Sequence, residues 1–108
     1  MTAWRTVCSE HDIPAGEARM FVLDDELIVA VFHIDGEFYA LDNACPHAGA
    51  SLAHGIVEND EVRCRIHHWR FAVRDGRYLD EDKPACNVRS FPVRREQGQL
   101  QIDVEPTP

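Results

Sequence analysis

The sequence predicts an all-β fold of some eight or nine short antiparallel strands with almost no helix, and three observations favour it. Valine, which is enriched in strands, occurs ten times in the chain. A helical spacing of hydrophobic residues is hard to find anywhere. Turn signals such as Asp35-Gly36 and Asn59-Asp60 separate short apolar runs, as in β-hairpins. Together these features are typical of a sandwich or a barrel.

Strand-like segments follow one another along the whole chain. In order, they cover residues 4–7, 18–23, 27–34, 37–42, 55–58, 61–63, 70–73, 77–79, 88–95 and 99–104. Segment 27–34 is apolar on both faces, so we expect it to be an interior strand. The last segment alternates, with Leu100 and Ile102 on one face and Gln101 and Asp103 on the other.

Two places interrupt this pattern. Residues 9–12 are expected to form one helical turn with Ser9 as its cap, ended by Pro14. Pro92 has no N–H to donate to a ladder, so it belongs at a sheet edge or a bulge within segment 88–95.

Size and charge exclude several classes of protein. A chain of 108 residues is about one domain, covering residues 1–108. Its 11 Lys and Arg against 19 Asp and Glu give a net charge of −8, which argues against nucleic-acid binding and against docking on anionic membranes. No apolar run exceeds six residues and no signal peptide is visible, so a cytoplasmic protein is expected. The four cysteines, which should be reduced there, are Cys8, Cys45, Cys64 and Cys86.

Two segments, 43–54 and 64–69, fit no strand and are rich in Cys, His, Gly and Pro. Each contains one Cys and one His that could bind a metal: Cys45 with His47, and Cys64 with His67. Sixteen residues, 48–63, separate the two pairs, and a predicted hairpin within them would bring the loops together at one end of the sheets.

Two metal centres take two Cys and two His. Zinc binds such a set as a closed tetrahedron, whereas a [2Fe–2S] cluster of the Rieske type takes two Cys on one iron and two His on the other. A zinc finger usually keeps its two Cys together and its two His together, but here each loop mixes them. The mixed spacing favours the cluster, while a zinc-stabilised binding module without redox activity stays as an alternative.

Loop residues 45–52 and 64–71 resemble the two cluster loops of the Rieske family, and the similarity extends over almost the whole chain, including 13–16, 38–43, 75–77 and 91–94. The resemblance implies stacked antiparallel sheets with one [2Fe–2S] cluster at a two-loop tip. The ligands it implies are Cys45, His47, Cys64 and His67. The sequence departs from the family at Arg65, where Pro is frequent.

The remaining candidates have simpler interpretations. His68 occupies a position where the family often has Gly, and both it and His54 are expected to be solvated loop residues. Cys8 and Cys86 are expected to be small buried hydrophobic residues. Trp69 either covers the cluster or fills the core beneath the loop.

The ligand set predicts a one-electron carrier rather than an enzyme. Two neutral imidazoles leave one iron electron-poor, so the transferred electron should localise there, close to a docking partner. The chain has no Gly-x-Gly-x-x-Gly fingerprint and is too short to include a separate oxygenase domain. The first hypothesis is a ferredoxin that carries electrons from a flavin reductase to a terminal oxygenase. The second is the small subunit of a cytoplasmic NADH-dependent nitrite reductase, which parts of the sequence also resemble.

The resemblance also predicts a low reduction potential. High-potential Rieske proteins of the respiratory type carry an extra Cys in each loop, joined as a disulfide, and hydroxyl groups that donate hydrogen bonds near the cluster. The matching positions here are Ala50 and Ile66 for the cysteines, and Trp69 and Phe71 for the hydroxyls. Because all four features are missing, we expect a midpoint in the lower part of the family range.

Overall fold

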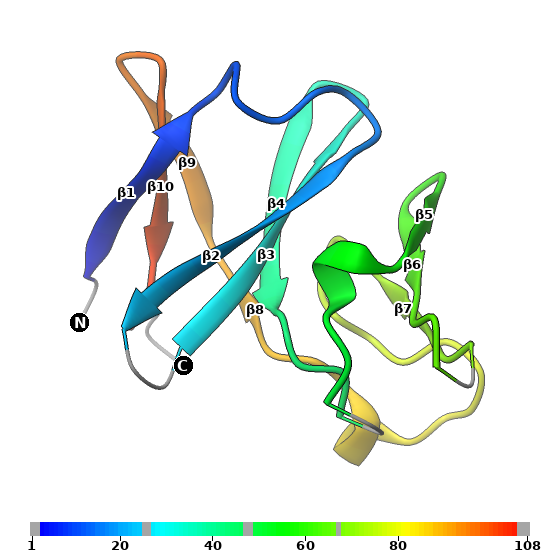
Figure 1. Ribbon diagram of the computed structural model, residues 1–108. Helices are drawn as coiled ribbons and strands as arrows, with labels where there is room; N and C mark the ends of the chain where they lie inside the picture. The colour runs from blue at the N-terminus through cyan, green and yellow to red at the C-terminus, as the bar shows by residue number, and fades with distance from the viewer. Residues whose placement is uncertain (1–2, 25–26, 47–48, 67, 106–108) are drawn as a thin grey trace.

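A computed structural model describes residues 3–24, 27–46, 49–66 and 68–105 (Figure 1). Within these ranges the chain forms ten strands and two short 3₁₀ turns. The strands are β1 (Trp4–Ser9), β2 (Ala18–Asp24), β3 (Leu27–Ile34), β4 (Glu37–Asp42), β5 (Ile56–Glu58), β6 (Glu61–Arg63), β7 (Arg70–Ala72), β8 (Ser90–Phe91), β9 (Val93–Glu96) and β10 (Gln99–Asp103), and the 3₁₀ turns are η1 (Leu52–His54) and η2 (Pro84–Cys86). The all-β prediction is confirmed.

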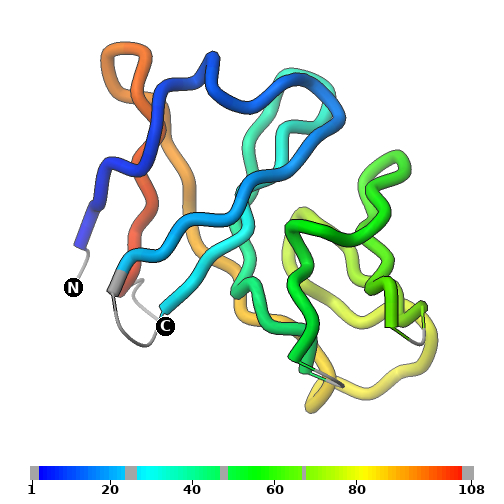
Figure 2. Tube along the Cα trace, viewed as in Figure 1, coloured from blue at the N-terminus to red at the C-terminus, as the bar shows by residue number. Residues whose placement is uncertain are grey.

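The strands form three antiparallel sheets. Their strand orders are β1-β10-β9, β2-β3-β4-β8 and β5-β6-β7. The four-stranded sheet lies between the other two (Figure 1). The β5–β7 sheet lies beside the loops that contain Cys45 and Cys64 (Figures 1 and 2). Because β1 pairs with β10, the two ends of the chain meet in one sheet.

Strand β3 is interior and buried on both faces, as its sequence predicts. Val29 and Val31 point into a core shared with Leu100 and Ile102 of β10. Ala30, Phe32 and Ile34 point the opposite way, into a second core with Leu52, Val62 and Phe71. The apolar character of both faces thus lets β3 join the two cores.

Tight turns connect the strands where the sequence predicts them. Asp35 and Asn59 both have left-handed φ angles, 52° and 57°, which suits short hairpins. Gly76 also has a positive φ, and a Cβ atom there would lie only 2.0 Å from the carbonyl oxygen of Val88. The expected strand 77–79 is reduced to a single bridge beside β7, because the chain turns away toward η2.

The prediction of a helical turn at residues 9–12 is wrong, and one polar residue of the last strand is buried. Residues 9–12 form a hydrogen-bonded turn rather than a helical turn, with the N–H of Asp12 donating to the Ser9 carbonyl at 3.0 Å. Asp103 belongs to the polar face of the last strand by its spacing, yet it is 2% exposed. Its Oδ1 accepts hydrogen bonds from the backbone N–H groups of Ala3 and Glu105, at 2.8 and 3.0 Å. These bonds compensate for the burial of the carboxylate.

The segment 88–95 is divided at Pro92 into β8 and β9, which belong to different sheets. This agrees with the expectation that Pro92 lies at an irregularity. In the described part of the chain, no helix is long and apolar enough to cross a membrane.

Candidate metal centre

The first loop leaves the end of β4 and closes on itself around Cys45. The Cys45 N–H donates to the carbonyl of Ala50 at 2.9 Å, and the N–H of Gly49 returns to the Cys45 carbonyl at 2.7 Å. Gly49 has a φ of 68°, so it adopts the left-handed turn conformation without steric cost. The Cys45 side chain is buried, with only 1% of its surface exposed.

The second loop is the hairpin connection between β6 and β7. The N–H of Cys64 donates to the carbonyl of Trp69 at 2.8 Å. Each cysteine therefore begins a loop that is closed by a bond to the carbonyl five residues later. Cys64 is fully buried, so both loops deliver their sulfur atoms inward.

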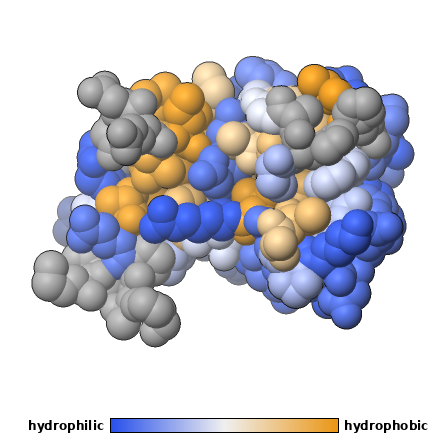
Figure 3. Space-filling model, turned by 90° about the horizontal axis from the view of Figure 1, so that it is seen from below, coloured by the Kyte–Doolittle hydropathy of each residue, from blue (hydrophilic) through white to orange (hydrophobic). Residues whose placement is uncertain are grey.

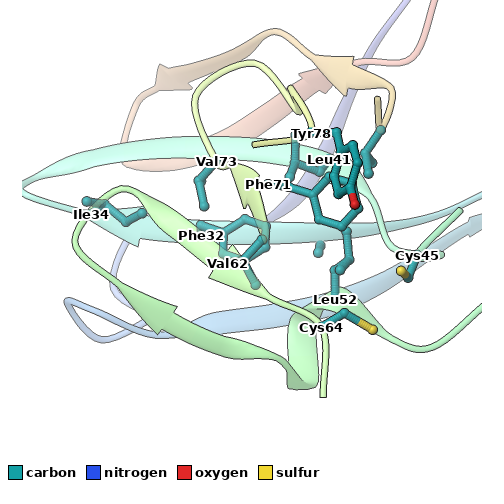
Figure 4. Packing of buried hydrophobic residues seen from close by; sticks show 12 residues of the cluster. Phe32, Ile34, Leu41, Cys45, Leu52, Val62, Cys64, Phe71, Val73 and Tyr78 are labelled. Carbon is teal, nitrogen blue, oxygen red and sulfur yellow. The ribbon is translucent and has the colours of Figure 1, made fainter. Parts of the chain in front are cut away.

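The two thiols meet between the loops. Cys45 and Cys64 are neighbours whose sulfur atoms lie at the same end of the core (Figure 4), and neither is in a disulfide. Burial raises the pKa of the Cys64 thiol, the backbone N–H of Ile66 acts in the opposite direction, and the neighbouring Cys45 raises it further. Figure 4 shows both sulfur atoms at one end of the core, beyond Leu52. Two adjacent buried thiols of this kind suit a metal centre, because iron or zinc stabilises the thiolate forms.

The two predicted histidine ligands, His47 and His67, lie outside the described residues. His54 and His68 are described, and both are exposed, as expected for solvated loop residues. Among the residues described, no third His, Cys, Asp or Glu joins the two cysteines in a group that could hold a metal.

An aromatic stack supports the second loop. Trp69 packs on Tyr78 with their ring centroids 4.6 Å apart, and Tyr78 contacts Phe71 at 5.7 Å. Trp69 is half-buried against the core beneath the loops, which favours its interpretation as a core residue. Tyr78 has no motif signal in the sequence, because its position depends on the return of the chain from β7.

Asn43 organises the first loop, and sequence reasoning missed it. Its side chain is buried, and its Oδ1 accepts hydrogen bonds from the hydroxyl of Ser51 at 3.1 Å and the N–H of Ala53 at 2.9 Å. Its backbone carbonyl accepts the N–H of Leu52 at 2.8 Å. Asn43 therefore joins the beginning of the loop that contains Cys45 to its end.

Cys8 lies against the other core, whereas Cys86 packs against the core that also contains Cys45 and Cys64. Cys8 and Cys86 are half-buried and pack against the two cores, close to the expectation of buried hydrophobic residues. Burial and the nearby Asp12 raise the pKa of the Cys8 thiol to about 11. At neutral pH this thiol is protonated and a poor nucleophile.

His68 has a φ of 60°, a left-handed conformation that favours glycine. We expect H68G to be more stable than H68A by about 1 kcal/mol, because alanine keeps a Cβ in this conformation. For a chain of this size the difference is about 4 °C in the midpoint of thermal unfolding, measured by circular dichroism. Equal midpoints for the two variants would contradict the left-handed conformation at this position.

Comparisons with known proteins agree with this geometry. Residues 3–92 match the family model described as the Rieske [2Fe-2S] domain. The chain is 35% identical over 103 residues to the ferredoxin component of the alkene monooxygenase system of Xanthobacter autotrophicus, covering 94% of this chain and 82% of that protein.

Solved structures share the fold. One is the complex of reduced oxygenase and oxidized ferredoxin in carbazole 1,9a-dioxygenase, with a TM-score of 0.87, 26% identity, and coverage of 96% of this chain and 95% of that one. Another is a putative NADH-dependent nitrite reductase small subunit from Mycobacterium tuberculosis, with a TM-score of 0.87, 30% identity and 99% coverage of both chains. The zinc alternative is not retained, because the matched family is one of [2Fe–2S] proteins. The chain belongs to the Rieske [2Fe–2S] domain family, and it is an electron carrier with one [2Fe–2S] cluster rather than an enzyme.

Proposed function

We propose that Cys45, His47, Cys64 and His67 hold the cluster, and that the protein passes electrons from a flavin reductase to a terminal oxygenase. The observation that carries the proposal is the burial of Cys45 and Cys64 with their sulfur atoms at the same end of the core (Figure 4). The histidines follow these cysteines by two and three residues, so each loop supplies one sulfur and one nitrogen ligand. This is the donor set of a Rieske centre.

The bound cluster accepts one electron and gives it up again. The residues of this chain hold the two sulfur ligands in a buried position, because Leu52 and Phe71 fill the space behind them. The N–H of Ile66 donates a hydrogen bond to the Cys64 sulfur and stabilises negative charge on it. The loops themselves lie at the edge of the molecule, where a partner can approach without entering a pocket (Figure 1).

The end of the molecule that carries the loops fits transient docking. The face of the molecule seen from below, which includes this end, mixes hydrophobic patches with hydrophilic side chains (Figure 3). Large, continuous apolar interfaces are typical of permanent complexes, whereas a carrier must separate from its partners after each transfer. The mixed surface therefore supports a shuttle.

An oxygenase is proposed as the acceptor because the 35% identical relative and the carbazole dioxygenase structure are both named as ferredoxins of oxygenase systems. A flavin reductase is proposed as the donor because a nicotinamide cofactor releases two electrons together, as one hydride, while the cluster takes one electron at a time. We also propose that residues 1–108 form one domain, since β1 and β10 pair at the two ends of the chain. A cytoplasmic location would keep Cys45 and Cys64 reduced for cluster assembly.

The second candidate is the small subunit of an NADH-dependent nitrite reductase. The match to the structure with that description covers 99% of this chain and 99% of the other, which supports the candidate. The two functions differ in the acceptor. The reduced protein should transfer its electron rapidly to an oxygenase encoded beside it, and a purified nitrite reductase large subunit should neither bind it nor oxidise it. The reverse result would favour the nitrite reductase.

Electrostatic attraction should accelerate docking. Part of the acidic charge behind the net −8 is neutralised locally, because Asp80 pairs with Arg70 and Glu81 with Lys83, each at 2.8 Å. Burial alone would raise the pKa of Asp80, but the hydrogen bonds from Arg70 outweigh it and hold that pKa below its ordinary value. We therefore assign the attraction to the overall charge.

The rate constant for reduction by the partner reductase should fall as salt rises. The Debye length shrinks from about 30 Å at 0.01 M to about 10 Å at 0.1 M, which screens long-range attraction. Stopped-flow measurement of cluster bleaching at several salt concentrations checks this. A rate constant that does not change with salt would remove the role of the net charge in docking.

A further inference from the structure

Arg65 forms a direct connection between the two loops. It follows Cys64 in the second loop, and its Nε donates a hydrogen bond to the backbone carbonyl of His54 at the end of η1. In the family that the sequence resembles, Pro is frequent at this position, and a proline side chain has neither a donor nor a charge. The connection is therefore a feature of this sequence.

The connection continues to the beginning of the first loop. His54 ends the 3₁₀ turn in which Ala53 donates its N–H to the Asn43 side chain at 2.9 Å. Asn43 precedes Cys45 by two residues. The bonds from Arg65 to His54 and from Ala53 to Asn43 thus connect the second loop to the segment before Cys45. Neither bond involves the cluster.

Arg65 also carries a positive charge in the residue that directly follows the buried Cys64 in the sequence. Its side chain is exposed, and within the described ranges no carboxylate lies in ion-pair distance of it. Glu17, which shares a surface hollow with Arg65, pairs with Arg19 at 3.4 Å. A cation here favours the reduced cluster, which is more negative than the oxidised one, although solvent screens part of the effect.

We propose that Arg65 is a positioning residue with two separable effects. Its hydrogen bond holds the two cysteine loops together, and its charge raises the reduction potential of the centre. The second effect rests on the proposed ligand set, whereas the first rests only on the bond to His54.

Two substitutions separate the bond from the charge. R65Q places an amide nitrogen at the position of Nε in the side chain and removes the charge. R65M has a similar length and removes both. The matched control is R74Q, which removes an exposed arginine in a different hollow, beside the Asp35 turn.

Amide hydrogen exchange tests the bond without reference to the cofactor. We expect the Ala53 and Gly55 amides to exchange several-fold faster in R65M than in wild type, while R65Q and R74Q stay at the wild-type rate. The rate of iron release to an excess of chelator should follow the same order. Equal exchange in R65M and wild type would overturn the positioning role.

Protein-film voltammetry tests the charge. We expect R65Q and R65M to lower the midpoint by the same amount at low salt, more than R74Q does, with the difference shrinking as salt rises. A midpoint in R65Q equal to that of R74Q would overturn the charge effect. Sulfide analysis of the wild type tests the proposed function separately. A protein without sulfide would refute the proposed [2Fe–2S] centre. The hydrogen-exchange result would still decide whether the Arg65 bond holds the loops together.

Discussion

Alanine at His47 or at His67 is expected to abolish the Rieske cluster. Wild-type protein should contain about two iron atoms and two sulfide ions per chain, as the cluster formula requires, and each variant should contain almost none. An imidazole nitrogen is the only strong ligand that either side chain can offer, and alanine offers none. Iron and sulfide analysis of anaerobically purified protein, together with the visible spectrum, measures the loss.

The sheets should survive this loss. The core formed by Val29, Val31, Leu100 and Ile102 lies between the β1-β10-β9 sheet and the central sheet, away from both cysteines. Far-ultraviolet circular dichroism of the two variants should therefore retain the β signal. The loops themselves are expected to lose order, because metal binding and local folding are coupled.

H54A and H68G provide the matched controls, since each changes an exposed histidine of the same loops. Both variants should keep the iron, the sulfide and the spectrum of the wild type. Loss of the cluster from H68G together with its retention in H67A would show that the ligands are assigned one residue out of register. One zinc and no sulfide in the wild type would contradict the cluster assignment as a whole.

The sheets could be predicted from the sequence because their signals are local. The continuous apolar run of residues 27–34 and the turn at Asp35-Gly36 place β3 and β4 at their observed bounds, since apolar runs and hairpin turns involve neighbouring residues only. The pairing of one Cys with one His in each loop is equally local. The proximity of Cys45 and Cys64 follows from the hairpin between them.

The polar residues that support the site could not be predicted in the same way. Asn43 and Arg65 act through partners 10 and 11 residues away, and these partners are backbone groups that carry no side-chain signature. Asp103 is buried because Ala3 lies across the sheet, 100 residues away. The alternation of side chains along a strand predicts which face of the sheet a residue occupies. It does not predict whether a distant part of the chain covers that face.

The second large effect is on the reduction potential, which we expect to lie at roughly −150 to 0 mV at neutral pH, the lower part of the range for Rieske centres. Hydrogen bonds to the sulfur atoms stabilise the reduced cluster and raise the potential. Phe71 is fully buried and has no donor, and Trp69 stands where high-potential proteins of the respiratory type have a hydroxyl. The backbone N–H of Ile66 remains as a donor to Cys64, so the potential should not fall below the family range.

Two charges act on this potential in opposite directions. The net charge of −8 disfavours adding an electron, while the proposed effect of Arg65, the residue after Cys64 in the sequence, favours it. Both are exposed to solvent and screened, so the missing hydroxyl donors should decide the value. Protein-film voltammetry at neutral pH measures it directly. A midpoint in the expected range suits a carrier between a flavin reductase and an oxygenase, whereas one near +300 mV, the upper end for Rieske centres, would show that the hydrogen-bond argument is wrong.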